Sequence, residues 1–277
     1  MDCHMHMILD GVEWKNAIGR HRDLPDDGFI RRVLGAYRDG GYTYLRDGGD
    51  RWGAGKRARE LAGEFGIVYR TPLSPLCKKG HYGAFIGESY VNLSEYAQLV
   101  RKMRENGADF IKIMISGLMD FDRFGHLTEE GLPRDEIREL IHIAHEEGFA
   151  VMAHANGART VEAAAQAGVD SVEHGAYLDG DALAAMEENG TIWVPTLSTV
   201  GNLRGKGRFH EGAVQAILEN ALENVAAYRG LIAPGSDAGA WQVFHGGHTE
   251  YELLRLGLKE RFESAMELGK QAIRQRF

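Results

Sequence analysis

Short apolar runs recur along the chain and alternate with segments of helical periodicity. Most runs are nearly continuous in aliphatic and β-branched residues, as in strands of a parallel sheet that is covered on both faces. These runs predict eight strands, at residues 2–8, 42–48, 67–73, 110–116, 150–155, 170–175, 191–197 and 231–236. Apolar residues at helical spacing predict eight helices, at 28–38, 55–65, 94–106, 134–147, 159–167, 181–188, 211–228 and 261–275.

Eight strands that alternate with eight helices indicate an α/β protein with a (β/α)8 TIM barrel fold. An open, doubly wound sheet is the alternative, although it rarely needs eight uninterrupted units. No linker interrupts the pattern, so residues 1–277 are predicted to form a single domain. The connections at 11–40 and 74–93 are longer than the others, and long connections in compact domains usually carry function.

Composition and charge argue against several classes of protein. The 32 Lys and Arg residues against 40 Asp and Glu residues give a net charge of −8, which argues against a nucleic-acid or anionic-membrane partner. No apolar run is long enough to span a bilayer. Two cysteines, Cys3 and Cys77, do not suggest a disulfide framework. With no signal-peptide pattern before the first strand, we expect a cytoplasmic protein.

The first strand carries two histidines on one face. Alternate side chains of an extended strand point the same way, so His4 and His6 can approach a single ion. Imidazole is the most common protein ligand for zinc-like metals. A chance pair of histidines remains the alternative when this motif is taken alone.

Four other candidate residues lie in or just after later predicted strands, near the end where the catalytic groups of a barrel gather. Lys112 lies within an otherwise apolar run, and His154 and His174 end the fifth and sixth strands. Asp237 follows the eighth strand in a Ser-Asp-Ala-Gly turn. Each residue alone has an ordinary structural explanation, but a barrel would bring all of them to the same end.

The order His-X-His, Lys, His, His, Asp resembles the amidohydrolase superfamily in its binuclear-metal subgroup. The surrounding residues are most similar to the imidazolonepropionase-related and prolidase-like (Xaa-dipeptidase) members. The stretches that carry this resemblance are 2–6, 45–49, 110–113, 153–157, 171–175 and 235–239.

The resemblance implies a site for two divalent metal ions, with zinc as the default for a histidine-rich site. His4, His6 and Asp237 would hold the more buried ion. His154 and His174 would hold the more exposed ion. Manganese, iron, cobalt or nickel could occupy the same ligands.

The resemblance also implies that Lys112 bridges the two ions as a carbamate formed with CO2. A buried ammonium is costly and would repel two cations, whereas a carbamate is an anionic ligand with two oxygens. A metal-bridging hydroxide would attack a carbonyl, and Asp237 would carry the proton to the leaving amine. The expected activity is therefore hydrolysis of an amide C–N bond in a small molecule such as a dipeptide or an N-acyl amino acid.

Other activities use nearly the same ligands. A lactonase, a cyclic-amide hydrolase or a deaminase remains open, although mononuclear deaminases of this fold lack the bridging lysine. A catalytically silent metal-binding scaffold is the alternative from another class. Every position of the metal set is filled, which favours an enzyme.

The loop after the third predicted strand provides two candidate substrate-binding residues. His81 and Tyr82 lie where the resembled family has a glycine-flanked histidine that reaches the substrate. A mobile surface loop is the alternative explanation.

The accessory β-sandwich of most relatives is not expected here, because nothing precedes the first strand or follows the last helix that could form it. An incomplete gene model is the alternative explanation. With almost no residues before the first strand, the lower end of the barrel is expected to be open or covered by a partner subunit. A homo-oligomer is compatible with this arrangement.

Overall fold

The computed structural model describes residues 1–277 and contains nine strands in two sheets, all paired in parallel. One sheet has the order β1-β2-β3, and the other has the order β5-β4-β6-β7-β8-β9. The strands are β1 (Asp2–Met5), β2 (Tyr44–Asp47), β3 (Val68–Arg70), β4 (Leu76–Lys78), β5 (Glu88–Tyr90), β6 (Ile111–Met114), β7 (Val151–Ala155), β8 (Ser171–His174) and β9 (Ile192–Val194). The predicted α/β class with parallel strands is confirmed.

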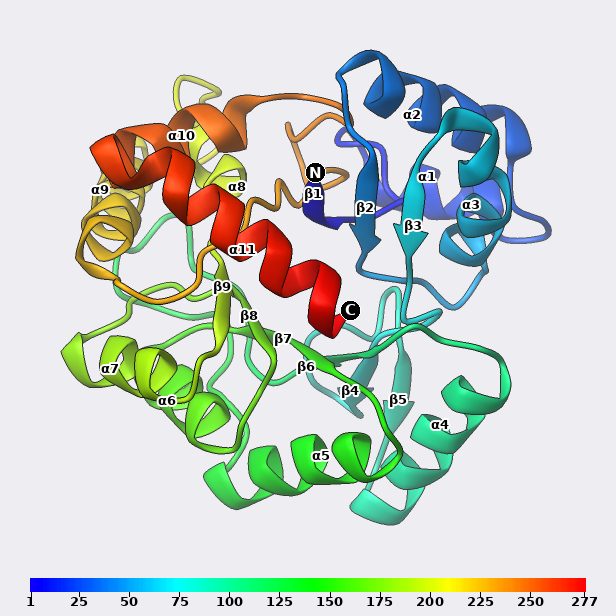
Figure 1. The fold of residues 1–277 in the computed structure, drawn as a ribbon, viewed down its shortest axis with the longest axis horizontal. Helices are drawn as coiled ribbons and strands as arrows, with labels where there is room; N and C mark the ends of the chain where they lie inside the picture. Colours follow the sequence, from blue (N-terminus) through cyan, green and yellow to red (C-terminus); the bar gives the residue numbers. More distant parts are fainter.

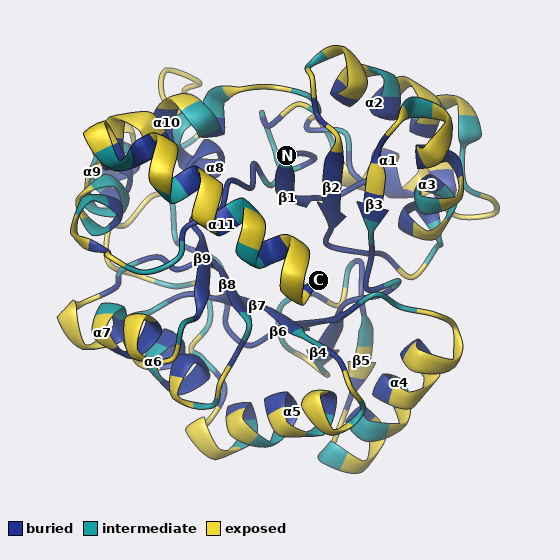
Figure 2. Ribbon diagram, in the orientation of Figure 1, coloured by how far each residue is buried: buried dark blue, intermediate teal, exposed yellow.

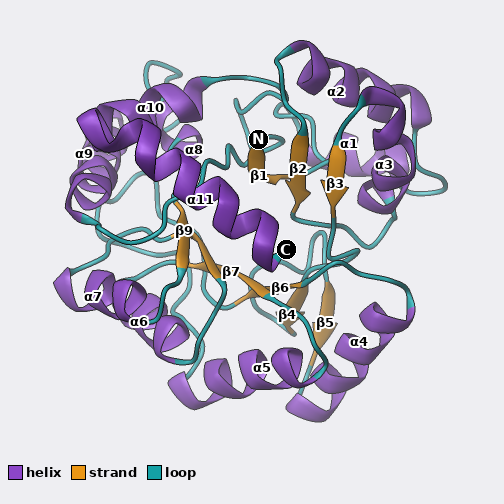
Figure 3. Cartoon of the chain, viewed as in Figure 1, coloured by secondary structure: helices purple, strands orange, loops and turns teal.

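Helices surround the strands (Figure 1 and Figure 3). They are α1 (Trp14–His21), α2 (Asp27–Asp39), α3 (Ala54–Ala62), α4 (Leu93–Glu105), α5 (Arg134–Glu146), α6 (Ala158–Gln166), α7 (Gly180–Glu188), α8 (Ser198–Gly201), α9 (Glu211–Ala227), α10 (Thr249–Leu258) and α11 (Phe262–Arg276). Figure 2 shows that the outer helices bury the face turned to the strands and expose the other, as their amphipathic sequences require. No helix is both long and apolar enough to cross a bilayer.

The two long connections contain regular structure that the periodicity did not predict. Helix α1 lies in the first of them, and β4 and β5 lie in the second. These elements are short, at 8 residues for α1 and 3 residues for each strand. Elements of this length contain too few repeats for a period to be recognised.

The eighth predicted strand is not a regular strand, and this prediction is corrected. Residues 231–236 form only an isolated bridge, between Ile232 and Trp193. Pro234 has no N–H to donate, which interrupts a ladder. The segment nevertheless contacts both sheets, because the N–H of Trp193 donates to Leu231 and the N–H of Cys3 donates to Pro234.

Helix α11 covers the end of the strands opposite the histidines, so the expectation of an open or partner-covered end is wrong. Figure 1 shows α11 crossing in front of the strands, with the C-terminus near their centre. Phe277 packs against the ring of Phe110 at 5.3 Å and lies 4.3 Å from the guanidinium of Arg46. Gly269 permits this close approach, because a Cβ there would overlap the backbone of Ile232.

Candidate metal centre

His4 of β1 and His6, which directly follows that strand, face each other at the centre of the strands. His4 is fully buried, His6 is 7% exposed, and their Nε2 atoms lie 3.3 Å apart. Gly48, which follows β2, leaves room for this pair, because a Cβ at that position would overlap the His6 ring. The backbone N–H of Gly48 donates to the carbonyl of Met5, which holds the two segments together.

A buried ion pair orients His4. Its Nδ1 lies 2.8 Å from Oε2 of Glu173, and the guanidinium of Arg46 lies 2.8 Å from Oε1 of the same carboxylate. Arg46 also donates to the carbonyl of Cys3 and to the hydroxyl of Ser171. Because a carboxylate only accepts hydrogen bonds, it keeps the His4 proton on Nδ1, and the Nε2 lone pair points toward Lys112 and His6.

Lys112 reaches the same point from β6. Its Nζ lies 2.9 Å from Nε2 of His4, and the residue is 1% exposed. Burial lowers the pKa of Lys112 to about 8, although the nearby carboxylates Glu173 and Asp237 oppose that shift. A larger fraction of this amine is therefore neutral at physiological pH than for an exposed lysine.

His154 and His174 lie beside this group, with ring centroids 4.5 Å apart. Nε2 of His154 donates to the carbonyl of Gly117 at 3.1 Å, and Nδ1 of His174 hydrogen-bonds with Thr196 at 2.7 Å. Burial lowers the pKa of His154 to about 4 and that of His174 well below its ordinary value. Each ring is thus neutral, with one nitrogen anchored and the other available as a ligand.

Asp237 completes the cluster from the segment after residue 236. Its Oδ1 lies 3.3 Å from Nε2 of His6 and 3.5 Å from Nε2 of His4. Asp237 and His174 both have a left-handed backbone, with φ of 57° and 70°. Residues other than glycine rarely adopt this strained backbone conformation, and here it directs both side chains at the cluster.

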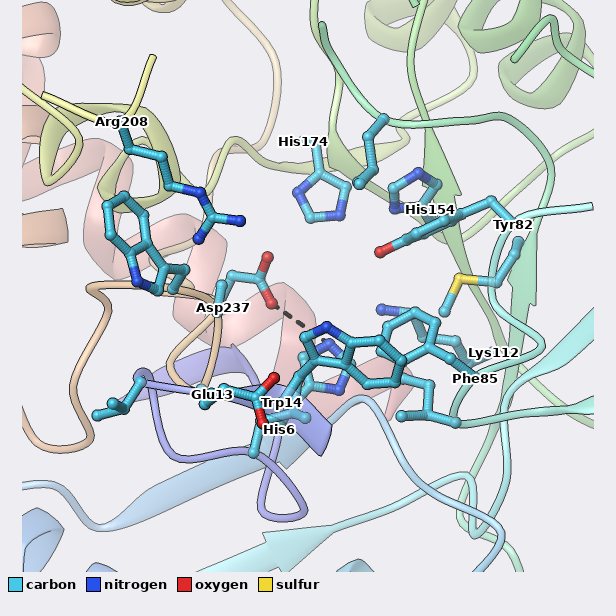
Figure 4. A pocket seen from close by; sticks show the side chains of 18 residues that line it. His6, Glu13, Trp14, Tyr82, Phe85, Lys112, His154, His174, Arg208 and Asp237 are labelled. Carbon is cyan, nitrogen blue, oxygen red and sulfur yellow. Dashed lines mark ion pairs between the residues drawn. The ribbon is translucent and has the colours of Figure 1, made fainter. Parts of the chain in front are cut away.

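A cavity of about 510 Å³ opens above the cluster and includes five of the six predicted metal-site residues in its wall (Figure 4). The sixth, His4, lies beneath them and is fully buried. The lining residues are His6, Leu9, Val12, Glu13, Trp14, Tyr82, Phe85, Ile86, Lys112, Met114, Leu118, His154, His174, Arg208, Asp237, Gly239, Ala240 and Trp241. Ten of these eighteen are hydrophobic, which suits a ligand with an apolar part.

The donor atoms of this cluster fit a metal. One ligand atom each from His4, His174 and Asp237 lies within 4.8 Å of the others. Nδ1 of His6 is buried without a hydrogen-bond partner. The nitrogen and carboxylate oxygen atoms that converge in this buried cluster are ligand types that suit divalent first-row metals.

The sequence is similar to a known family over most of the strands described above. The model of the amidohydrolase family matches residues 60–238. The chain belongs to the amidohydrolase family. Ochratoxinase from Aspergillus niger is 26% identical over 290 residues, which cover 91% of this chain and 58% of that protein. An uncharacterized protein from Mycobacterium bovis is 33% identical over 121 residues, which cover 40% of this chain and 32% of that protein. The chain thus spans less than two thirds of the length of these family members.

Solved structures share the amidohydrolase fold. A Xaa-Pro dipeptidase with bound methionine superposes with a TM-score of 0.77 at 21% identity, covering 99% of this chain and 74% of that one. A prolidase in complex with N-methylphosphonate-L-proline gives a TM-score of 0.76 at 22% identity, with the same coverage. The ochratoxinase of A. niger gives 0.74 at 21% identity, covering 98% and 70%.

The two predicted substrate-binding residues lie in different surroundings. Tyr82 lines the cavity, and its ring centroid lies 4.7 Å from that of His154. His81 does not line the cavity, and its Nδ1 forms an ion pair with Glu129 instead. A role for His81 in substrate binding stays a prediction, and it would require this ion pair to open.

Several residues that build the site were missed from the sequence. Glu173 had one available signal, because a charged residue within an otherwise buried strand requires a partner. Asn156 was also missed, and its amide donates to the same Gly117 carbonyl that anchors His154. Arg208 lies in an irregular segment, where no period indicates the direction of a side chain.

Proposed function

We propose that this amidohydrolase is a metal-dependent hydrolase that cleaves an amide bond of a small molecule such as a dipeptide or an N-acyl amino acid. The convergence of His4, His174 and Asp237 with Lys112 at the floor of a largely apolar cavity carries this proposal. The named prolidases and ochratoxinase among its relatives support an amide substrate by analogy alone.

In this proposal the site holds two divalent ions, with zinc as the first candidate. His4, His6 and Asp237 would hold the inner ion, and His154 and His174 would hold the outer one. When bound, such ions polarise a carbonyl and lower the pKa of water so that hydroxide is available near neutral pH.

Lys112 is proposed to act as a carbamate between the two positions. Its neutral amine attacks the carbon of CO2, a C–N bond forms, and one proton leaves to solvent. The lowered pKa of the buried amine supports this step, because only the neutral form is nucleophilic. The product is an anion in place of a cation, which removes the repulsion between Lys112 and two metal ions.

Asp237 is proposed to accept the proton of the attacking water on its carboxylate and to pass it to the leaving amine. The strained backbone of Asp237 directs this carboxylate into the cavity, next to Nε2 of His6. The phenol of Tyr82 lies in the wall beside His154 and is proposed to orient the substrate carbonyl.

We also infer that the two sheets belong to one closed (β/α)8 barrel. Residues 231–238 hydrogen-bond to β9 on one side and to β1 on the other. Opposite them, the N–H of Asp109 donates to the carbonyl of Thr71, which links the end of β3 to the start of β6. A crystal structure in which β3 and β6 are not joined would contradict closure.

The deciding experiment is metal analysis per chain, on protein purified without chelator in bicarbonate buffer, together with hydrolysis of dipeptides and N-acyl amino acids. We expect about two equivalents and turnover for the wild type. Lys112→Ala should lose turnover and one equivalent, whereas Lys56→Ala, on the exposed face of α3, should lose neither. One equivalent with deaminating activity would replace the hydrolase proposal by a deaminase, and zero equivalents would leave a scaffold.

A further inference from the structure

One charged side chain in the cavity wall makes no polar interaction with the candidate metal ligands or with the rest of the chain. Arg208 lines the cavity, and its guanidinium forms no ion pair and no hydrogen bond with any other residue. It lies 4.5 Å from the Trp241 ring and 5.2 Å from the Phe209 ring. These two rings are themselves packed edge to face at 6.1 Å, so they hold the guanidinium from its apolar side.

The other charged side chain in the wall above the candidate metal ligands, Glu13, already has hydrogen-bond partners. Glu13 caps helix α1, and its carboxylate accepts hydrogen bonds from the N–H groups of Lys15 and Asn16 at 3.2 and 2.8 Å. Arg208 is therefore the one charged side chain above the metal cluster whose hydrogen-bonding capacity is free. A planar guanidinium with five free donors suits a carboxylate.

The position of Arg208 indicates which half of a substrate it would meet. Figure 4 shows its guanidinium on the same side of the cavity as Asp237, with Tyr82 and Phe85 on the opposite side. In the proposed reaction Asp237 passes a proton to the leaving amine. A group bound by Arg208 thus belongs to the amine half of the substrate, and the acyl half lies toward the rings of Tyr82 and Phe85.

We propose that Arg208 binds a carboxylate on the amine half of the substrate. The preferred substrate is accordingly an N-acyl amino acid or a dipeptide with a free C-terminal carboxylate and an apolar acyl group, not a neutral or cyclic amide. This inference rests on the proposed hydrolase function and assigns a specificity-determining residue to it.

The test compares two probes that differ in charge, N-benzoyl-L-leucine and N-benzoyl-L-leucinamide. Benzoate release is measured with wild type, Arg208→Gln, Arg208→Lys and the control Arg204→Gln. Arg204 and Arg208 are both exposed arginines of the same segment, but Arg204 lies outside the cavity. We expect the wild type to favour the acid ~10- to 100-fold in kcat/KM, as for a hydrogen-bonded charge pair. Arg208→Gln should lose this preference through KM, Arg208→Lys should keep part of it, and Arg204→Gln should keep all of it.

A binding measurement with the two probes distinguishes a failure of the carboxylate site from a failure of the proposed hydrolase function. Both probes are titrated calorimetrically into the metal-loaded wild type and into the same variants, with no requirement for turnover. A preference for the acid that Arg208→Gln removes supports the carboxylate site even if neither probe is cleaved, in which case only the hydrolase proposal fails. Equal binding of the two probes by the wild type would overturn the carboxylate site. So would an equal loss for both probes in Arg208→Gln.

Discussion

Nδ1 of His4 and Oε2 of Glu173 lie 2.8 Å apart, although 169 positions separate the two residues in the chain. The contact joins β1 to β8, and Arg46 of β2 closes it from the other side of the carboxylate. His4 is thus oriented by the buried ion pair of Glu173 and Arg46, and the three residues belong to three different strands. Such partners determine both the tautomer and the direction of a ligand histidine.

Glu173→Gln should weaken metal binding ~10- to 100-fold, because the neutral amide no longer holds the His4 proton on Nδ1. The measurement is competition with a metal-binding dye, together with metal content after dialysis. Glu263→Gln is the control, since Glu263 is 80% exposed and pairs only with Arg255. Unchanged affinity in Glu173→Gln would show that His4 is oriented without its carboxylate partner.

Gly48→Ala should reduce metal content strongly, because the new methyl group overlaps the His6 ring and forces it to move. Gly19→Ala is the matched control, since a Cβ there contacts nothing within 4 Å. Gly19 lies inside helix α1, where alanine should raise the free energy of unfolding by ~0.5–1 kcal/mol. Metal analysis and urea denaturation of both variants separate the local collision from a general effect of alanine. Full metal content in Gly48→Ala would contradict a requirement for glycine beside His6.

Glu250 predicts a pH dependence of stability. Burial raises the pKa of Glu250 from 4.5 to about 8, and its Oε2 accepts hydrogen bonds from the N–H and hydroxyl of Ser198. Because the folded state binds this proton more tightly than the unfolded state, the contribution is present below pH 4.5 and is lost as pH rises toward 8.

Glu250→Gln keeps the shape of the protonated side chain without this loss. It should exceed the wild type in unfolding free energy by about 4 kcal/mol at pH 8 and by almost nothing at pH 4.5, at ~1.4 kcal/mol per pKa unit. Glu252→Gln, on an exposed position of the same helix α10, should not change the pH profile. Parallel urea profiles of wild type and Glu250→Gln from pH 5 to 8 would refute the linkage.

Removal of metal should destabilise the protein, because the ligands are assembled only in the folded state. At free zinc 100-fold above its Kd, the gain in unfolding free energy over chelated protein should be ~2.7 kcal/mol. His4→Ala should abolish most of this difference, and His142→Ala should preserve it, since His142 is 61% exposed on α5. The comparison uses the difference between loaded and chelated protein, so a loss of packing in His4→Ala does not obscure it. A full zinc response in His4→Ala would exclude His4 as a ligand.

Much of the fold was predictable because its signals are local. The burial of β6 and β7 on both faces is visible in the sequence, because each run is apolar except for Lys112 or His154. The helices around them show apolar residues at a spacing of 3.6. Residues 231–236 were wrongly predicted to form a regular strand, because their apolar character is that of a strand while Pro234 prevents a regular ladder.

The cover formed by α11 was not predictable for a different reason. The amphipathic pattern of α11 predicts that one face is buried, but it does not indicate which residues pack against that face. Only the folded chain shows that Phe277 packs on Phe110 and Arg46, beneath the pair that orients His4.

The sequence by itself determined the α/β class, and it placed the six candidate metal ligands in or next to strands, since strand period and residue type are properties of neighbouring positions. These residues are His4, His6, Lys112, His154, His174 and Asp237. The tertiary structure alone decided that Glu173 orients His4, that His81 pairs with Glu129 and that Arg208 lines the cavity. These relationships join residues that are distant along the chain or lie in irregular segments. Neither case leaves a periodic signal, so chain folding has to bring the side chains together before their chemistry can be recognised.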